Sequence, residues 1–260
     1  MKEKEIQYEQ IRKKAQDIIQ GYKRISCLPK QAERGRTEAG SRNVEASCLI
    51  GIYDRTNTKD TKQLKELQES KLEEWAKYEN IWFDHTDIRK NWKRIDDWTS
   101  KEAEVYGFKE TKTVRKVFHY DAIDSNYTPM DFINNRISIH NALFSTTKYK
   151  LLGFTKSYKG FANERFAFVL EQPFIEGEKM TEKEIEEFMR SIGFPNNSGI
   201  YHWNDYYIVD DLHSGNILKM KNEDGIYEMF VIDPNPSLNT SKIKGGKSKY
   251  LPFRIVETIV

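Results

Sequence analysis

The chain has 260 residues, of which 38% are hydrophobic and 32% charged, and its formal net charge is only +2. So small a net charge creates no overall positive electrostatic field that would attract nucleic acid. The two cysteines, Cys27 and Cys48, are too few for a disulfide framework. No apolar run approaches the roughly 20 residues of a membrane span, and the first residues contain no signal-peptide core. We therefore expect a cytoplasmic protein with a core of one two-lobed domain or two small domains.

The first 90 residues predict two helices with a polar stretch between them. Residues 3–20 carry apolar side chains on one side and end at Gly21. Residues 22–43 are basic and rich in turn formers, but acidic residues are mixed in, which favours a solvated loop over a polyanion site. Leucines at helical spacing predict the second helix over about 61–79.

Short β-branched or alternating runs dominate the chain from about residue 92. The runs "WKRIDDWT", "AEVYGFK" and "KTVRKVFHY" predict three antiparallel strands, and Pro129 then opens the helical pattern "MDFINNRISIHNALF". Two further strands are predicted in "YKLLGFTK" and "RFAFVLEQPF".

A second capped helix and three more strands follow. Thr181 with Glu184 three residues later is a capping box at the start of a helix. Strands are then predicted in "IYHWNDYYIVDDL", "NILKM" and "YEMFVID", of which the last two form a hairpin. Strands, helix, strands, helix, strands is an α+β order rather than an alternating βαβ order.

Polar side chains stand where these last three runs meet. Asp211 follows the first run, Asn216 precedes the second, and Asp233 ends the third, so the hairpin returns Asp233 toward Asn216. A nucleotide phosphotransferase needs one carboxylate for the acceptor hydroxyl, and an amide and a second carboxylate for Mg²⁺. The pattern Asp, Asn, hairpin, Asp predicts such a site.

Other readings of this stretch are weaker. A zinc site at His213 with Asp210 and Asp211 lacks a further histidine at ligand spacing, so His213 is interpreted as a loop support and Asp210 as a turn residue. Ser214 lacks the Gly-x-Ser-x-Gly elbow of a nucleophile. The segment "GGKSK" at 245–249 lacks the first glycine of a Walker loop and is interpreted as a tail loop.

On these residues the chain resembles the protein-kinase-like superfamily. "VDDLHSGNIL" is similar to the H-G-D-L-H-P-G-N-I-L catalytic loop of small-molecule and atypical kinases. The resemblance implies that Asp211 is the catalytic base, and that Asn216 and Asp233 bind the metal and, through it, the nucleotide. The chain departs from the family at Val209, where a histidine is expected, and at "DPN", which replaces D-F-G.

The resemblance extends upstream. Lys116 in "TVRKVF" matches the lysine that neutralises nucleotide phosphates during catalysis. Gly107 is the only glycine of the phosphate-covering segment and is expected to follow its strand. The next helix lacks the glutamate that pairs with this lysine, and Asn134 is one candidate for a neutral acceptor in its place.

The segment "VLEQPFIEG" resembles the last N-lobe strand and the hinge of a kinase. This implies that the backbone near Glu171 and Gln172 meets adenine, and that Phe168 or Leu170 lines the nucleotide pocket.

Residues 92–240 as a whole most resemble the kinase domain of bacterial polyvalent proteins of mobile elements. The resemblance implies a compact two-lobed α+β fold with an antiparallel-sheet N-lobe and a small helical and hairpin C-lobe. The expected boundaries are 1–90 for an N-terminal helical extension, 91–175 for the N-lobe and hinge, and 176–260 for a minimal C-lobe.

The expected activity is ATP- and Mg²⁺-dependent transfer of the γ-phosphoryl group to a hydroxyl of a protein or a small molecule. Nucleotide and this acceptor are the expected partners, and neither a membrane nor a nucleic acid is expected. Two alternatives stay open. The missing helix glutamate, the poor glycine loop and Val209 favour a pseudokinase or nucleotide-binding interaction module, and an AMP-transferring kinase-like enzyme fits the same residues.

Overall fold

The computed structural model describes residues 61–96, 102–122, 125–158 and 163–239. The predictions for residues 3–20, 22–43 and 245–249, and those for the two cysteines, lie outside the described residues. Helices and antiparallel sheets make up the described part, which confirms an α+β fold. Among the described helices, none has the length and apolar character to cross a membrane.

The chain divides into two compact units, which are described separately below. Unit 1 comprises Met1–Ile133 and Lys150–Glu171, and unit 2 comprises Asn134–Tyr149 and Gln172–Val260. One boundary therefore lies inside a helix and another inside a strand.

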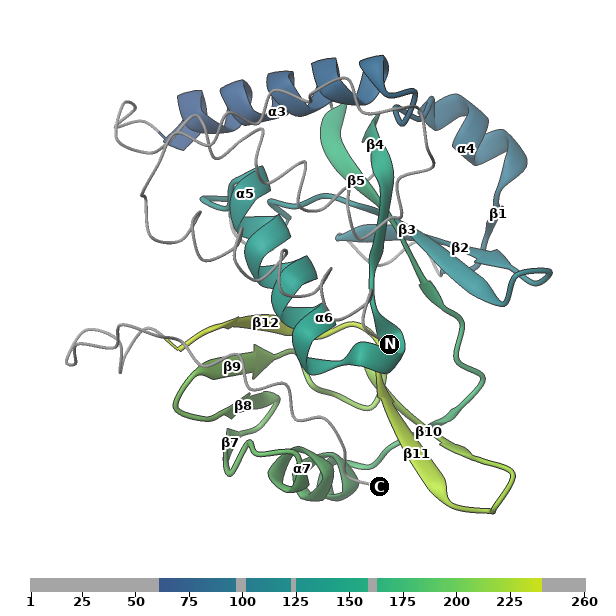
Figure 1. The fold of residues 1–260 in the computed structure, drawn as a ribbon, viewed down its shortest axis with the longest axis vertical. Coiled ribbons are helices and arrows are strands. Elements are labelled where there is room, and N and C mark those ends of the chain that lie inside the picture. The colour runs from purple at the N-terminus through teal and green to yellow at the C-terminus, as the bar shows by residue number, and fades with distance from the viewer. Residues whose placement is uncertain (1–60, 97–101, 123–124, 159–162, 240–260) are drawn as a thin grey trace, which may run out of the picture. The chain divides into compact units, whose positions relative to one another are not determined.

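The described part of unit 1 forms a five-stranded antiparallel sheet with the strand order β1-β2-β3-β5-β4 (Figure 1). Its strands are β1 (Lys93–Arg94), β2 (Ala103–Phe108), β3 (Thr113–Phe118), β4 (Lys150–Ser157) and β5 (Arg165–Pro173). These are the five strands predicted from "WKRIDDWT" to "RFAFVLEQPF". The prediction for Gly107 was wrong in one respect: it lies inside β2, paired with Lys93 and Val114, rather than after the strand.

Two helices pack against β4 (Figure 1). The predicted helix is confirmed as α3 (Thr61–Tyr78), which buries Leu64, Gln68, Leu72 and Ala76 at four-residue spacing. The other helix, α4 (His85–Asn91), was not predicted. It begins at Asp84, whose carboxylate accepts from the amides of Thr86 and Asp87. The apolar core between α4 and the sheet consists of Ile88, Tyr106, Val117, Ala167 and Val169.

The predicted helix after Pro129 is confirmed, but most of it is wound as a π-helix. It consists of α5 (Pro129–Asp131), the π-helix η1 (Phe132–Ile139) and α6 (His140–Leu143). Thr128 and Asp131 cap its start with a reciprocal capping box. Such π-wound stretches are rare and are frequent at functional sites. The unit boundary after Ile133 lies within η1.

The described residues of unit 2 form a three-stranded sheet, β11-β10-β6, and a four-stranded sheet, β12-β9-β8-β7 (Figure 1). Their strands are β6 (Glu178–Lys179), β7 (Asn196–Ser198), β8 (Tyr201–Trp203), β9 (Tyr207–Asp210), β10 (Ile217–Lys221), β11 (Tyr227–Val231) and β12 (Asn235–Leu238). Besides α6 and most of η1, the described helices of unit 2 are η2 (Ser145–Thr147) and α7 (Glu182–Ser191). The predicted β10–β11 hairpin and the capping box of Thr181 and Glu184 at the start of α7 are confirmed. Strands β6, β7 and β12 were not predicted.

A single apolar cluster holds unit 2 together. It packs Ile185 and Met189 of α7 against Val209 of β9, Ile217 of β10 and Val231 of β11. Asp211 follows β9, Asn216 precedes β10 and Asp233 comes shortly after β11, so the cluster also fixes where these three polar residues lie.

Candidate active site

Asp211 stands at the end of β9 in a backbone conformation that few side chains adopt. Its φ is +63°, in the left-handed region, where aspartate is better tolerated than most residues. The preceding Asp210 carboxylate accepts the Asp211 amide, which agrees with its interpretation as a turn residue. Leu212 is buried in the apolar cluster and anchors the turn. Sparsely populated conformations of this kind concentrate at functional sites.

Asn216 is bound directly to Asp211. Its Nδ2 donates to the backbone oxygen of Asp211 at 2.8 Å and to the carboxylate Oδ2 at 2.9 Å. Because both contacts use the amide nitrogen, the amide oxygen of Asn216 is turned away from Asp211. The five-residue spacing of the motif thus brings a carboxylate and an amide oxygen to one loop.

His213 supports this loop, as predicted. Its Nδ1 accepts from the Gly215 amide at 3.0 Å, and its backbone oxygen accepts from the Asn216 amide at 2.9 Å. Its Nε2 lies 3.6 Å from Oδ1 of Asp211. The zinc reading finds no support, since no group of three or more metal-binding His, Cys, Asp or Glu side chains occurs in the part of the chain that the structure describes.

Asp233 follows β11 and is held by two buried side chains of unit 2. Nη2 of Arg136 donates to Oδ1 of Asp233 at 2.7 Å, and the Tyr149 hydroxyl donates to the same oxygen at 2.9 Å. Only 3% of the Arg136 side chain is exposed. Burial and the Asp233 charge both raise the pKa of Tyr149, so this hydroxyl remains a hydrogen-bond donor.

The charges around Asp211 have opposite effects on the pKa of its carboxyl. Partial burial raises the pKa of the Asp211 carboxyl, and the negative charges of Asp233 and Asp210 act in the same direction. His213 and Arg136 lower it. The charge of Asp233 therefore acts on Asp211, and both residues belong to unit 2.

The donor set of this site fits Mg²⁺. The ion prefers hard oxygen ligands and takes only one or two carboxylates from a protein, with phosphate and water completing the octahedron. The Asn216 amide oxygen, turned away from Asp211, and the Asp233 carboxylate are ligands of that kind. Arg136 and Tyr149 both bind Oδ1 of Asp233 and so hold the carboxylate in one orientation.

Two of the predicted nucleotide-binding residues belong to unit 1. Lys116 is buried on β3, opposite Val105 of β2. Glu171, near the end of β5, accepts from Arg115 at 3.0 Å through its carboxylate and is paired with Lys150 of β4 in the sheet. Phe168 lies in an aromatic cluster of unit 1, with its ring centre 4.7 Å from that of Phe132.

Gln172 is the first residue of β5 assigned to unit 2. Its side chain is buried, and Nε2 donates to the backbone oxygen of Ile232 at 3.0 Å. The side chain of this predicted hinge residue is therefore bound to the residue before Asp233. The structure brings Asp211, Asn216, Asp233 and Gln172 together within unit 2.

Sequence reasoning did not identify Arg136 or Tyr149. A signal for Arg136 exists: it lies four residues after Phe132 and four before His140, on the face of the helix that is otherwise apolar or buried. A buried arginine requires a partner, so its position predicts a carboxylate opposite it. Tyr149 carries no such signal, since tyrosine is a normal core residue.

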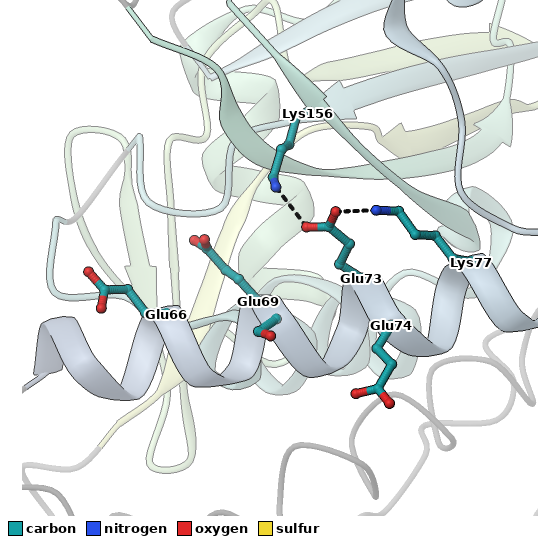
Figure 2. Close-up of a pocket in the computed structure, with 7 residues that line it drawn as sticks. Glu66, Glu69, Glu73, Glu74, Lys77 and Lys156 are labelled. Carbon is teal, nitrogen blue, oxygen red and sulfur yellow. Dashed lines mark hydrogen bonds and ion pairs between the residues drawn. The ribbon is translucent and has the colours of Figure 1, made fainter.

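One pocket in the described part of unit 1 lies along α3 and contains none of the predicted site residues (Figure 2). It is lined by Glu66, Glu69, Ser70, Glu73, Glu74, Lys77 and Lys156. The Glu73 carboxylate binds Lys156 at 2.7 Å and Lys77 at 2.6 Å, so these charges compensate one another (Figure 2). We interpret this pocket as a surface of ion pairs.

The family model Kinase-PolyVal, described as a serine/threonine/tyrosine kinase found in polyvalent proteins, matches residues 65–240. The match begins inside α3 and includes every residue of the loop and hairpin described above. No curated protein and no solved structure gives a significant match.

Proposed function

Because the chain belongs to the family of serine/threonine/tyrosine kinases found in polyvalent proteins, we propose that it transfers the γ-phosphoryl group of ATP to a hydroxyl in a Mg²⁺-dependent reaction. The observation that carries this proposal is the convergence of Asp211, Asn216 and Asp233 at three strand ends of unit 2. Phosphoryl transfer depends on positioning and charge neutralisation; these side chains position the acceptor and hold the Mg²⁺ ion, and the ion and Lys116 neutralise the phosphate charge.

Each residue has a distinct role in this proposal. Asp211 orients the acceptor hydroxyl and accepts its proton, and the guanidinium of Arg136 counteracts the rise of its pKa that burial causes. Asn216 and Asp233 hold the Mg²⁺ ion, which when bound neutralises charge on the transferred phosphate. Lys116 binds the nucleotide phosphates.

The adenine binds at the predicted hinge. The backbone near Glu171 and Gln172 supplies its hydrogen bonds, as the resemblance implies. The ion pair of Glu171 with Arg115 fixes the end of β5, and the bond from Gln172 to Ile232 fixes the chain that follows.

In this proposal the two compact units correspond broadly to the two lobes of a kinase. We assign 91–175 to an N-lobe with the hinge and 176–260 to a minimal C-lobe, with 1–90 as an N-terminal extension. The antiparallel sheet of unit 1 and the hairpin, helix and polar loop of unit 2 support this assignment, whereas residues 134–149 and 172–175 of the proposed N-lobe fall in unit 2. The family match starts at residue 65, so the last part of the extension is shared with the family.

The acceptor is a hydroxyl of a protein or a small molecule. The family description specifies serine, threonine and tyrosine, which favours a protein hydroxyl. Cytoplasmic location and an origin in a mobile element are part of the same proposal.

A pseudokinase is the second candidate, and two observations favour it. Val209, where related loops carry histidine, is fully buried in the apolar cluster. The carboxylate of Asp233 is neutralised by the buried Arg136, which competes with a cation for its charge. Such a protein binds nucleotide without turnover.

Position-specific labelling separates these functions. The protein is incubated with Mg²⁺ and ATP labelled at the γ- or the α-phosphate, and label transfer and ATP turnover are followed. We expect γ-phosphate chemistry in the wild type and its loss in Asp211→Asn and Asp233→Asn. Asp224→Asn, in the exposed hairpin turn, is the matched control and retains it.

Three results contradict the kinase assignment. Incorporation of the α-label indicates AMP transfer, nucleotide binding without turnover indicates a pseudokinase, and no nucleotide binding removes the site assignment altogether.

A further inference from the structure

The segment that leads into Asp233 is bound by side chains from another part of unit 2. The Thr147 hydroxyl donates to the backbone oxygen of Val231 at 2.5 Å. The Tyr149 hydroxyl lies 3.2 Å from the backbone oxygen of Ile232 and 2.9 Å from Oδ1 of Asp233. The three residues 231–233 are therefore held in sequence by η2 and the residues just after it.

Tyr149 is itself rigidly held. Its amide donates to the Asn141 side-chain oxygen at 2.7 Å, and its backbone oxygen accepts from Nδ2 of Asn141 at 2.8 Å. Its ring lies against the ring of His140, with the centroids 4.4 Å apart. Two residues of α6 thus fix both the backbone and the ring of Tyr149, and the hydroxyl has little freedom to leave Asp233.

Arg136 approaches the same carboxylate oxygen from η1. Its guanidinium supplies charge, whereas the Tyr149 hydroxyl supplies only a hydrogen bond. A carboxylate bound by one donor can still rotate about its last torsion, for which the preference is broad. Two buried donors on one oxygen restrict that rotation and thereby set where the other oxygen points.

We propose that Tyr149 and Arg136 are positioning residues for Asp233: by binding Oδ1 together, they hold the carboxylate in the orientation in which it binds the divalent cation. This inference rests on the proposed function, because it gives Asp233 the role of a metal ligand. It adds two residues to the site that neither the motif nor the family match assigns.

Tyr149→Phe tests the inference most cleanly, since it removes one hydroxyl without changing charge or ring volume. Partners that orient a metal ligand typically contribute tenfold or more to metal affinity. We expect about tenfold weaker binding of the Mn²⁺ complex of a non-hydrolysable ATP analogue, with an unchanged dissociation constant for the analogue in EDTA. Both constants are measured by titration, without turnover.

Tyr120→Phe is the matched control. The Tyr120 hydroxyl is also buried and donates to a carboxylate, that of Glu69 at 2.6 Å, but it belongs to unit 1 and is not part of the proposed site. Its removal should leave both dissociation constants unchanged. Arg136→Lys is the second variant: it keeps the positive charge but loses the planar fork, so we again expect weaker binding only when metal is present.

The outcomes are distinguishable. Loss of metal-dependent binding in Tyr149→Phe and Arg136→Lys, with Tyr120→Phe unaffected, supports positioning. Wild-type binding in both variants overturns the positioning role and leaves the proposed function intact. Equal weakening with and without metal also overturns it, because that result indicates a purely structural role. If metal does not strengthen nucleotide binding even in the wild type, the proposed function itself fails.

Discussion

The left-handed backbone of Asp211 predicts an unusual order of stability among its variants. At a φ of +63°, a residue with a Cβ atom incurs about 1–2 kcal/mol of strain, and glycine incurs none. Glycine loses about 0.5–1 kcal/mol more than alanine through its greater freedom in the unfolded chain. Both substitutions remove the hydrogen bond from Asn216, so this loss cancels in the comparison.

Asp211→Gly should therefore be more stable than Asp211→Ala by about 0.5–1 kcal/mol. Urea unfolding followed by fluorescence measures the difference, provided that the two variants share one m-value. At Asp224, where φ is not positive, the order should reverse, so Asp224→Ala and Asp224→Gly form the matched control pair. If Asp211→Ala equals or exceeds Asp211→Gly in stability, the strained turn is not a property of the folded protein.

Three further predictions concern stability. Asp233→Ala breaks the ion pair of the buried Arg136 and should lower the free energy of unfolding by about 3–5 kcal/mol, and Asp233→Asn by less, as measured by urea unfolding. Burial lowers the pKa of His119 to about 4. Since the unfolded chain binds that proton near pH 6.5, stability should fall by up to about 3 kcal/mol as the pH drops from 6.5 through 4. Denaturation at several pH values should show this dependence reduced in His119→Gln. Gly153→Ala should cost more than about 2 kcal/mol in the same assay, because a Cβ there lies 1.9 Å from the Ile81 backbone oxygen.

Local sequence rules predicted those parts of the fold that depend on local contacts. The capping box of Thr181 and the β10–β11 hairpin are determined by residues a few positions apart, and both are confirmed. Helix α4 was missed because its seven residues bury only His85 and Ile88, too few for a periodic pattern. Strand β12 was missed because Pro236 argues against a strand, although it lies in a terminal strand of the described sheet, where proline is tolerated.

In the candidate site, too, contacts between residues close in the sequence could be predicted and contacts between distant residues could not. The bond between Asp211 and Asn216 joins residues five positions apart, and the motif contains both. The ion pair of Arg136 with Asp233 joins residues 97 positions apart, and no local pattern connects them. The sequence could show that a buried arginine needs a carboxylate, but only the packing of η1 in unit 2 shows which carboxylate it binds.

In the proposed function, Asp211 acts on an acceptor hydroxyl in a Mg²⁺-dependent phosphoryl transfer. The most direct measurement compares release or transfer of the γ-label from ATP by the wild type and Asp211→Asn, at equal nucleotide occupancy and with Mg²⁺ present. We expect turnover by the wild type and a loss of at least about a hundredfold in the variant, as for removal of a general base. Equal turnover by the two proteins would contradict it.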